Sequence, residues 1–153
     1  MPELGELAPE FILPATGGTQ IRLSDLRGHN VVLYFYPKDD TTGCTKEAQD
    51  FNSLHAAFAA TGTRVIGVSP DGLASHDKFR RKYGLELTLA SDEAKQALQA
   101  YEVWTEKSMY GRKYMGVERT TFLIDRSGRI ARVWRKVKVP NHAAEVLAAA
   151  ESL

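Results

Sequence analysis

The fold of this chain is decided by the stretch Val31-Val32-Leu33-Tyr34-Phe35-Tyr36, which ends at Pro37. The run is unbroken, apolar, and rich in β-branched and aromatic residues, which is typical of a central strand buried on both faces. A second run, Arg64-Val65-Ile66-Gly67-Val68-Ser69, has the same character and is closed by Pro70. Together they predict two neighbouring strands in the middle of a sheet.

The segment between these two strands has a helical pattern. Its apolar side chains recur at the spacing of one helix face, at Ala48, Phe51, Leu54 and Phe58. Residues 31–69 are therefore expected to form one βαβ unit. Its two strands should be parallel, with a right-handed crossover.

Shorter elements surround this unit on both sides. Before it, the first 27 residues suggest a small hairpin. After it we expect, in chain order, a helix over about 73–83, an extended piece at 87–90, a helix from Ser91-Asp92-Glu93 to about Ala100, a loop or short hairpin over 105–116, strands at 120–124 and 130–134 joined by a turn at 125–128, and a last helix that Asn141 caps.

A βαβ half followed by a β-hairpin and a terminal helix predicts an α/β fold. We expect a mixed central β-sheet flanked by helices on both faces, as in the thioredoxin fold. A flavodoxin-like doubly wound sheet is the alternative, but the turn at 125–128 argues against it because that fold needs crossovers. No linker or repeat divides the chain, so residues 1–153 are expected to be a single domain.

Composition narrows the classes of function. The chain has 20 basic and 19 acidic residues, a net charge of +1, which gives no sign of a nucleic-acid or membrane surface. Its start lacks the apolar core of a signal peptide, and no stretch is long enough to cross a bilayer. A single cysteine excludes an internal disulfide and fits a cytoplasmic, reducing location. Four scattered histidines predict no metal site.

The single cysteine, Cys44, lies just past the first clear strand, where a helix begins. In open α/β sheets this edge is where ligands bind. A thiol in the first turn of a helix is near unpaired N–H groups and the positive end of the helix dipole, and both stabilise the reactive thiolate. A small buried cysteine that only fills space is the alternative reading.

Three blocks of sequence extend the pattern around this cysteine. They are Pro37-x-x-x-Thr41-x-Gly43-Cys44-Thr45-x-Glu47-Ala48, a stretch from Tyr101-x-Val103-Trp104 to Arg119-x-Thr121-Phe122-Leu123-Ile124-Asp125, and the opening Gly5-x-x-Ala8-Pro9-x-Phe11. Together they cover nearly the whole chain and resemble the peroxiredoxins, specifically their Q-type or bacterioferritin-comigratory branch. The resemblance implies a thiol-dependent peroxidase with an antioxidant role, acting on hydrogen peroxide and organic hydroperoxides without metal or other cofactor.

The resemblance also implies roles for single residues. The Cys44 thiolate would attack the terminal peroxide oxygen and become a sulfenic acid. Arg119 would be the cation beside thiolate and peroxide, and the Thr41 hydroxyl would hold a peroxide oxygen. Supporting roles would fall to Pro37, which shields the thiol, Gly43, whose backbone N–H is a donor, and Glu47, which orients Arg119. Each of these also has a plain structural reading as a turn, edge or helix-end residue.

Two positions depart from the branch. Thr42 stands where proline is common, and Gln49 stands where many members carry a second, resolving cysteine. The sulfenic acid must therefore meet an external thiol, such as glutathione or a cysteine of a thioredoxin or glutaredoxin. A Cys44–Cys44 disulfide between subunits is the other route. The branch suggests a monomer, with a weak dimer as the alternative.

Other functions fit less of the sequence. A dithiol oxidoreductase needs Cys-x-x-Cys, but position 47 is glutamate. A cysteine hydrolase needs a histidine base, and no histidine stands in a motif with Cys44. A redox sensor or holdase, in which oxidation of Cys44 changes a binding surface, is the alternative that the missing second cysteine favours.

Overall fold

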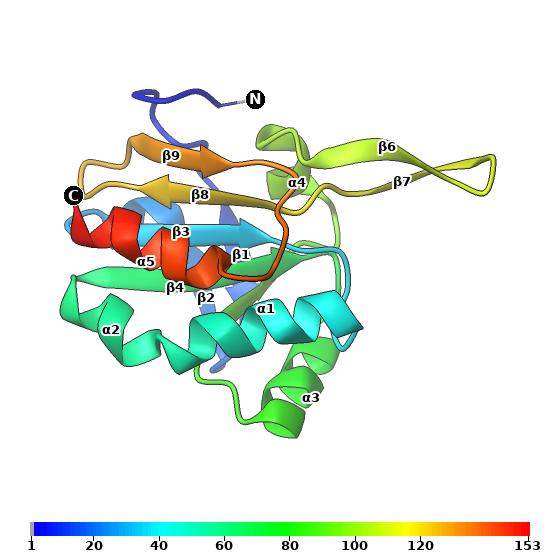
Figure 1. Ribbon diagram of the computed structural model, residues 1–153, viewed down its shortest axis with the longest axis horizontal. Helices are drawn as coiled ribbons and strands as arrows, with labels where there is room; N and C mark the ends of the chain where they lie inside the picture. Colours follow the sequence, from blue (N-terminus) through cyan, green and yellow to red (C-terminus); the bar gives the residue numbers. More distant parts are fainter. Residues whose placement is uncertain (1) are drawn as a thin grey trace.

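A computed structural model describes residues 2–153, and its core is a mixed sheet of seven strands (Figure 1). The order across this sheet is β2-β1-β5-β4-β3-β8-β9. The strands are β1 (Ile12–Ala15), β2 (Thr19–Arg22), β3 (Asn30–Phe35), β4 (Thr63–Ser69), β5 (Thr88–Ser91), β8 (Thr120–Ile124) and β9 (Ile130–Trp134).

The centre of the sheet confirms the predicted βαβ unit. β3 runs parallel to β4 over six residue pairs, from Asn30↔Thr63 to Phe35↔Val68. β8 is antiparallel to β3, and β9 is antiparallel to β8 through the turn at 125–128. An antiparallel hairpin at one edge excludes the flavodoxin-like alternative, so the thioredoxin-like arrangement is confirmed.

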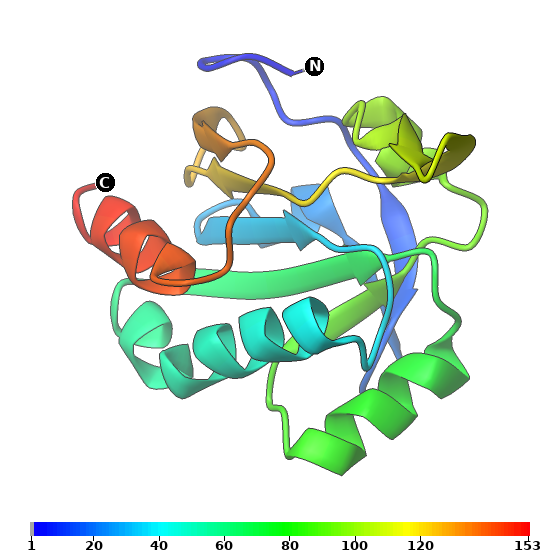
Figure 2. The same ribbon diagram turned by 45° about the vertical axis from the view of Figure 1, so that its right-hand side comes forward.

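The alternation of β3 builds a core on each face of the sheet. Val32, Tyr34 and Tyr36 face an apolar cluster with the main helices, whereas Val31, Leu33 and Phe35 belong to the cluster on the other face. The first layer holds α1 (Thr42–Ser53), α2 (His55–Ala60), α3 (Leu73–Tyr83) and α5 (His142–Glu151), and the second holds the short helices η1 (Leu23–Leu26) and α4 (Gln96–Ala100) (Figures 1 and 2).

Two helices differ from the prediction. The helix after β3 is broken at Leu54 into α1 and α2. α4 begins at Gln96 and not at Ser91, because Ser91 still belongs to β5, where its hydroxyl donates to the carbonyl of Asp71 at 2.6 Å. The Asp92 carboxylate does accept backbone N–H groups of the helix, but from Gln96 and from Leu98 further on.

Residues 104–117 form a hairpin of their own. β6 (Trp104–Met109) pairs with β7 (Arg112–Val117) in a separate two-stranded sheet that reaches away from the body of the molecule (Figure 1). The tip uses Tyr110 and Gly111, both with positive φ, as tight hairpin turns require. Of the two readings of this segment, the hairpin is correct. Over residues 2–153, no helix combines the length and apolar character needed to cross a bilayer.

His142 is buried at the start of α5, where it contacts β8. Its Nε2 lies 2.8 Å from the hydroxyl of Thr121, and its ring packs edge-on against Phe51 and Trp134. Burial lowers the pKa of His142 to about 4, and the positive charge of Arg119 acts in the same direction. The folded protein therefore holds this histidine neutral, whereas the unfolded chain protonates it at its ordinary pKa.

His142 should make the fold less stable in acid. The unfolded chain binds a proton at His142 below about pH 6.5, and the folded protein does not until about pH 4. The free energy of unfolding should therefore fall as pH drops through this window, by at most about 3 kcal/mol. Urea unfolding of wild type and His142→Gln at several pH values measures this. An equally steep acid slope in the variant would contradict it.

Candidate active site

Cys44 is the third residue of α1 and is almost fully buried, at 1% exposure. The first backbone bond of this helix runs from Thr45 N–H to the carbonyl of Thr41, at 2.8 Å. The N–H groups of Gly43 and Cys44 thus have no carbonyl one turn earlier within the helix to bond. The thiol therefore lies where the N-terminal amides and dipole of α1 favour a negative charge, as the sequence predicted.

Arg119 reaches this thiol from a different part of the chain. It lies in the short link between β7 and β8, and its backbone carbonyl accepts from Val137 N–H at 3.0 Å. Its guanidinium contacts two side chains of α1: Nη2 is 3.3 Å from Cys44 Sγ, and Nη1 is 2.5 Å from Glu47 Oε1. Burial opposes the charge, but Glu47 and Cys44 together raise the pKa of Arg119, so it stays a cation.

Glu47 lies one helical turn after Cys44 and is 1% exposed. Burial raises the pKa of Glu47 to about 7, although the charge and hydrogen bond of Arg119 act in the opposite direction. Its second oxygen, Oε2, has no hydrogen-bond partner among the described residues. One cation thus contacts two acidic groups, Glu47 and Cys44.

Gly43 makes room for the arginine. A Cβ atom at this position would lie 3.2 Å from Arg119 Nη2, closer than an ordinary contact. The backbone of the first turn of α1 and the guanidinium therefore pack directly against each other. The sequence pattern suggested Gly43 as a source of a backbone donor; the structure adds this second reason for glycine, which concerns space.

Gly43→Ala should slow peroxide reduction about 10-fold while leaving the fold intact. The added methyl group pushes the guanidinium away from Cys44 by a few tenths of an ångström, and small misplacements at a reacting centre are costly. Alanine at a helix position does not itself destabilise the helix. The rate constant with hydrogen peroxide measures the effect, and Thr42→Ala, at the exposed neighbouring position, is the control. Equal rates for Gly43→Ala and wild type would contradict this role.

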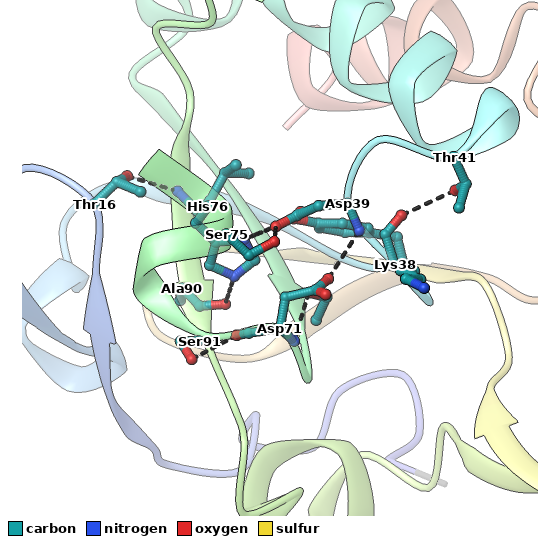
Figure 3. Close-up of polar contacts among 12 residues, drawn as sticks. Thr16, Lys38, Asp39, Thr41, Asp71, Ser75, His76, Ala90 and Ser91 are labelled. Atoms are coloured by element: carbon teal, nitrogen blue, oxygen red, sulfur yellow. Dashed lines mark hydrogen bonds and ion pairs between the residues drawn. The ribbon is translucent and has the colours of Figure 1, made fainter. Parts of the chain in front are cut away.

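Thr41 and Pro37 lie in the loop between β3 and α1. Pro37 is half-buried, and Thr41 is exposed at the position before α1. The Thr41 hydroxyl donates to the carbonyl of Lys38 at 2.9 Å (Figure 3). The structure thus brings Cys44, Gly43, Glu47 and Arg119 into contact, whereas the side-chain hydrogen bond of Thr41 is to its own loop. The roles of Thr41 and Pro37 toward peroxide stay predictions.

A shallow pocket opens beside the arginine. It has a volume of about 390 Å³ and includes Arg119, Lys107 and Lys136 in its lining. Burial and the charge of Arg119 lower the pKa of Lys107, which places this lysine within electrostatic reach of the site. Gly116 allows the Lys107 side chain to cross the hairpin, since a Cβ there would lie 3.1 Å from it. The lining also holds Glu106 and Glu118, so the surface beside Arg119 carries charges of both signs.

A polar cluster that the sequence did not predict lies at the Pro37–Thr41 loop. Possible ligand atoms of Asp39, Asp71 and His76 lie within 4.8 Å of one another, an arrangement that could hold a metal ion. Hydrogen bonds inside the cluster already occupy these atoms, however. A buried histidine more than 30 positions from its aspartate has no local pattern, so only the folded chain brings the two together.

The fold and this site define a thioredoxin-fold protein with an arginine-paired cysteine in the first turn of a helix. The chain belongs to the AhpC/TSA family, whose characteristic pattern matches residues 4–133. Peroxiredoxin Bcp of Bacillus subtilis is 48% identical over 145 residues, which are 95% of this chain and 92% of that protein. Membership makes this protein a peroxiredoxin, a thiol-dependent peroxidase, and confirms the resemblance.

Solved structures agree with this assignment. The bacterioferritin comigratory protein of Xanthomonas campestris, studied for alkyl peroxide reduction, matches with a TM-score of 0.89 and 45% identity over 93% of this chain and 90% of that one. A cysteine-to-serine mutant of PrxQ from Xylella fastidiosa matches with a TM-score of 0.94 and 40% identity, over 99% and 97% of the two chains.

Proposed function

We propose that this protein reduces hydrogen peroxide and alkyl hydroperoxides with the Cys44 thiolate, and that Arg119 and Thr41 assist. The thiolate attacks the terminal oxygen, an S–O bond forms, and the O–O bond breaks. The departing hydroxide or alkoxide takes up a proton and leaves as water or an alcohol. Cys44 is oxidised to sulfenic acid as the peroxide is reduced. The observation that carries this proposal is the 3.3 Å contact between Arg119 Nη2 and Cys44 Sγ.

The arginine matters more than the ionisation of the thiol. An ordinary cysteine is about 3% thiolate at pH 7, so complete ionisation increases the rate at most about 30-fold. Nucleophilicity also falls as a thiol becomes more acidic, which reduces that gain. Most of the acceleration must therefore come from donors aimed at the charge that develops on the departing oxygen. The fixed fork of Arg119 supplies such donors.

The pocket and the relatives support organic hydroperoxides as substrates. The Xanthomonas relative is described for alkyl peroxide reduction. In this chain the pocket beside Arg119 is open and has both aliphatic stems and cationic groups in its lining. An organic group attached to the peroxide would lie along this surface while its terminal oxygen meets Cys44. Pro37 would cover the thiol from the other side.

Reduction of the sulfenic acid then depends on an external thiol. The thiol condenses with Cys44–OH, water leaves, and a mixed disulfide forms; a second thiol releases Cys44 and carries away the disulfide. Gln49, where a resolving cysteine would stand, has no thiol and cannot take part. Thioredoxin, glutaredoxin and glutathione are the proposed reductants, in a cytoplasmic setting. The protein would act as a monomer or weak dimer, without a nucleic-acid or membrane partner.

A redox sensor or holdase is the second candidate. It is favoured by the single cysteine, since without an internal resolving thiol the oxidised state lasts longer. In that case oxidation of Cys44 would change a binding surface, and turnover would be incidental. Slow recycling with every thiol donor would distinguish it from the enzyme.

Stopped-flow mixing of the reduced protein with hydrogen peroxide or an alkyl hydroperoxide tests the proposal. Oxidation is followed by tryptophan fluorescence, beside Cys44→Ser. We expect a rate constant far above that of free cysteine, and no reaction in the variant. A wild-type rate constant near that of free cysteine would contradict the peroxidase proposal and favour the redox sensor or holdase.

A further inference from the structure

The loop that leads into the active site is held by one buried carboxylate. Residues 36–41 connect β3 to α1, and Asp39 lies in their middle, 7% exposed. Its Oδ1 accepts from the Tyr36 hydroxyl at 2.6 Å, and its Oδ2 accepts from Ser75 Oγ at 2.8 Å (Figure 3). Its backbone N–H donates to Asp71 Oδ2 at 2.8 Å. The centre of the loop is thus fixed to the start of α3 and the segment before it.

His76 of α3 completes this attachment and is fully buried. Its Nδ1 lies 2.7 Å from Asp39 Oδ2, and its Nε2 lies 3.0 Å from the backbone carbonyl of Ala90 in β5 (Figure 3). A carbonyl oxygen can only accept, so Nε2 must carry a proton. The Asp39 carboxylate accepts hydrogen bonds from the hydroxyls of Tyr36 and Ser75. Both ring nitrogens of His76 thus face oxygen atoms that can accept a hydrogen bond, the arrangement that suits an imidazolium.

We propose that His76 is a positioning residue for peroxide reduction: as a buried imidazolium it ties Asp39, and through it the Pro37–Thr41 loop, to β5. The chain of contacts runs from the Ala90 carbonyl through His76 and Asp39 into the loop that leads to Cys44. We call these three residues, Ala90, His76 and Asp39, the loop clamp. This inference rests on the proposed peroxidase function, because it concerns how the same site is held.

A second attachment points to the same helix. Asp40 accepts from Lys82 Nζ at 2.7 Å and from the Tyr83 hydroxyl at 2.5 Å, both at the end of α3. Asp40 has a positive φ of 60°, a conformation that such tertiary contacts help to hold. These contacts are exposed and contribute little stability on their own. Their position nevertheless shows that successive loop residues, Asp39 and Asp40, both use α3 as their support.

The loop clamp should act in opposite directions on the two half-reactions. Attack on peroxide needs the Cys44 thiolate and the Arg119 guanidinium in a fixed position relative to each other. A loop that is anchored to α3 and β5 keeps the start of α1, and with it Cys44, in that position. Reduction of the sulfenic acid needs a larger thiol to reach a sulfur whose residue is 1% exposed, so the loop or the helix start must then open. A weaker clamp should therefore slow the first step and leave the second unchanged or faster. A general loss of structure would slow both.

Two matched variants test this. His76→Gln cannot carry the positive charge or span both acceptors as the imidazolium does, and His142→Gln makes the same change at another buried histidine outside the clamp. We expect His76→Gln to slow peroxide reaction about 10-fold, without slowing reduction of the pre-oxidised protein by a thiol. His142→Gln should change neither step more than about 2-fold. Equal slowing of both steps in His76→Gln would overturn the proposal.

A second measurement does not depend on the variant folding or on activity. A long-range ¹H–¹⁵N spectrum of the ring nitrogens of the wild-type protein, reduced and at neutral pH, reports whether each nitrogen carries a proton. We expect two protonated nitrogens at His76 and an unprotonated nitrogen at His142. An unprotonated ring nitrogen at His76 would refute the proposed imidazolium even if the protein reduces peroxide rapidly. Two protonated nitrogens in a protein that does not reduce peroxide would show that the proposed function, and not the imidazolium, had failed.

Discussion

Arg119→Ala is expected to slow the reaction with hydrogen peroxide by about 10²–10³-fold, the usual effect of removing one preorganised donor at a developing anion. The guanidinium is the group that contacts both Cys44 Sγ and Glu47. Its loss removes the cation beside the thiolate and the donors for the departing oxygen. Stopped-flow fluorescence at several peroxide concentrations gives the second-order rate constant.

The controls separate charge from geometry. Arg119→Lys keeps the charge but not the planar fork, so its rate should lie between wild type and Arg119→Ala. Arg135→Ala removes another arginine, one that pairs with Glu118 and is half-exposed, and should leave the rate unchanged. Because Arg119→Ala leaves Glu47 buried without its partner, the double variant with Glu47→Gln checks that the loss is not an effect of that carboxyl. A rate within about 3-fold of wild type for Arg119→Ala would refute the role.

Without an added thiol, each molecule is expected to reduce one equivalent of peroxide and then stop. Cys44 is the only cysteine in the chain, so no internal thiol can resolve its sulfenic acid. Excess peroxide should then oxidise the sulfenic acid to sulfinic acid, which thiols do not reverse. Peroxide consumption against protein concentration, with intact mass, measures both stages. Multiple turnovers without thiol, or retained activity after a high peroxide dose, would contradict the expectation.

Gln49→Cys supplies the matched comparison. Positions 44 and 49 both lie on α1, about 7.5 Å apart along its axis and on different sides, too far for a disulfide while the helix is intact. If the start of α1 can unwind, this variant should form an internal disulfide and survive peroxide doses that inactivate wild type.

The sequence predicted those parts of the fold that carry local patterns. β3 and β4 are nearly continuous apolar runs, and the 125–128 turn has its own turn chemistry, so both were correct. The start of α4 was wrong because Ser91-Asp92 has the composition of a helix N-terminus, while tertiary contacts keep Ser91 in a strand. Local preference yields to such contacts at short elements.

Some contacts of the active site could be predicted from the sequence, and others could not. Cys44 and Glu47 share one helix face at a three-residue spacing, which geometry alone places together. Arg119 is 72 positions from Glu47, and only the family resemblance linked the two. Asp39 and His76 are 37 positions apart and belong to no periodic pattern or motif, so their contact could not be predicted from the sequence. The need for space at Gly43 likewise appears only when Arg119 lies against it.

The N-terminal strand has a consequence for how the chain is made in the cell. β1 pairs with β5 through Ala15↔Ala90, and Leu7 forms a bridge with Arg129. At about 5–20 residues per second, a ribosome needs roughly 6–25 s to pass from the first of these bridge partners to the second. Throughout that time the apolar side chains of Phe11 and Leu13 lack their final cover. The nascent chain therefore exposes apolar surface until its last strands emerge, which makes this interval the one most prone to aggregation.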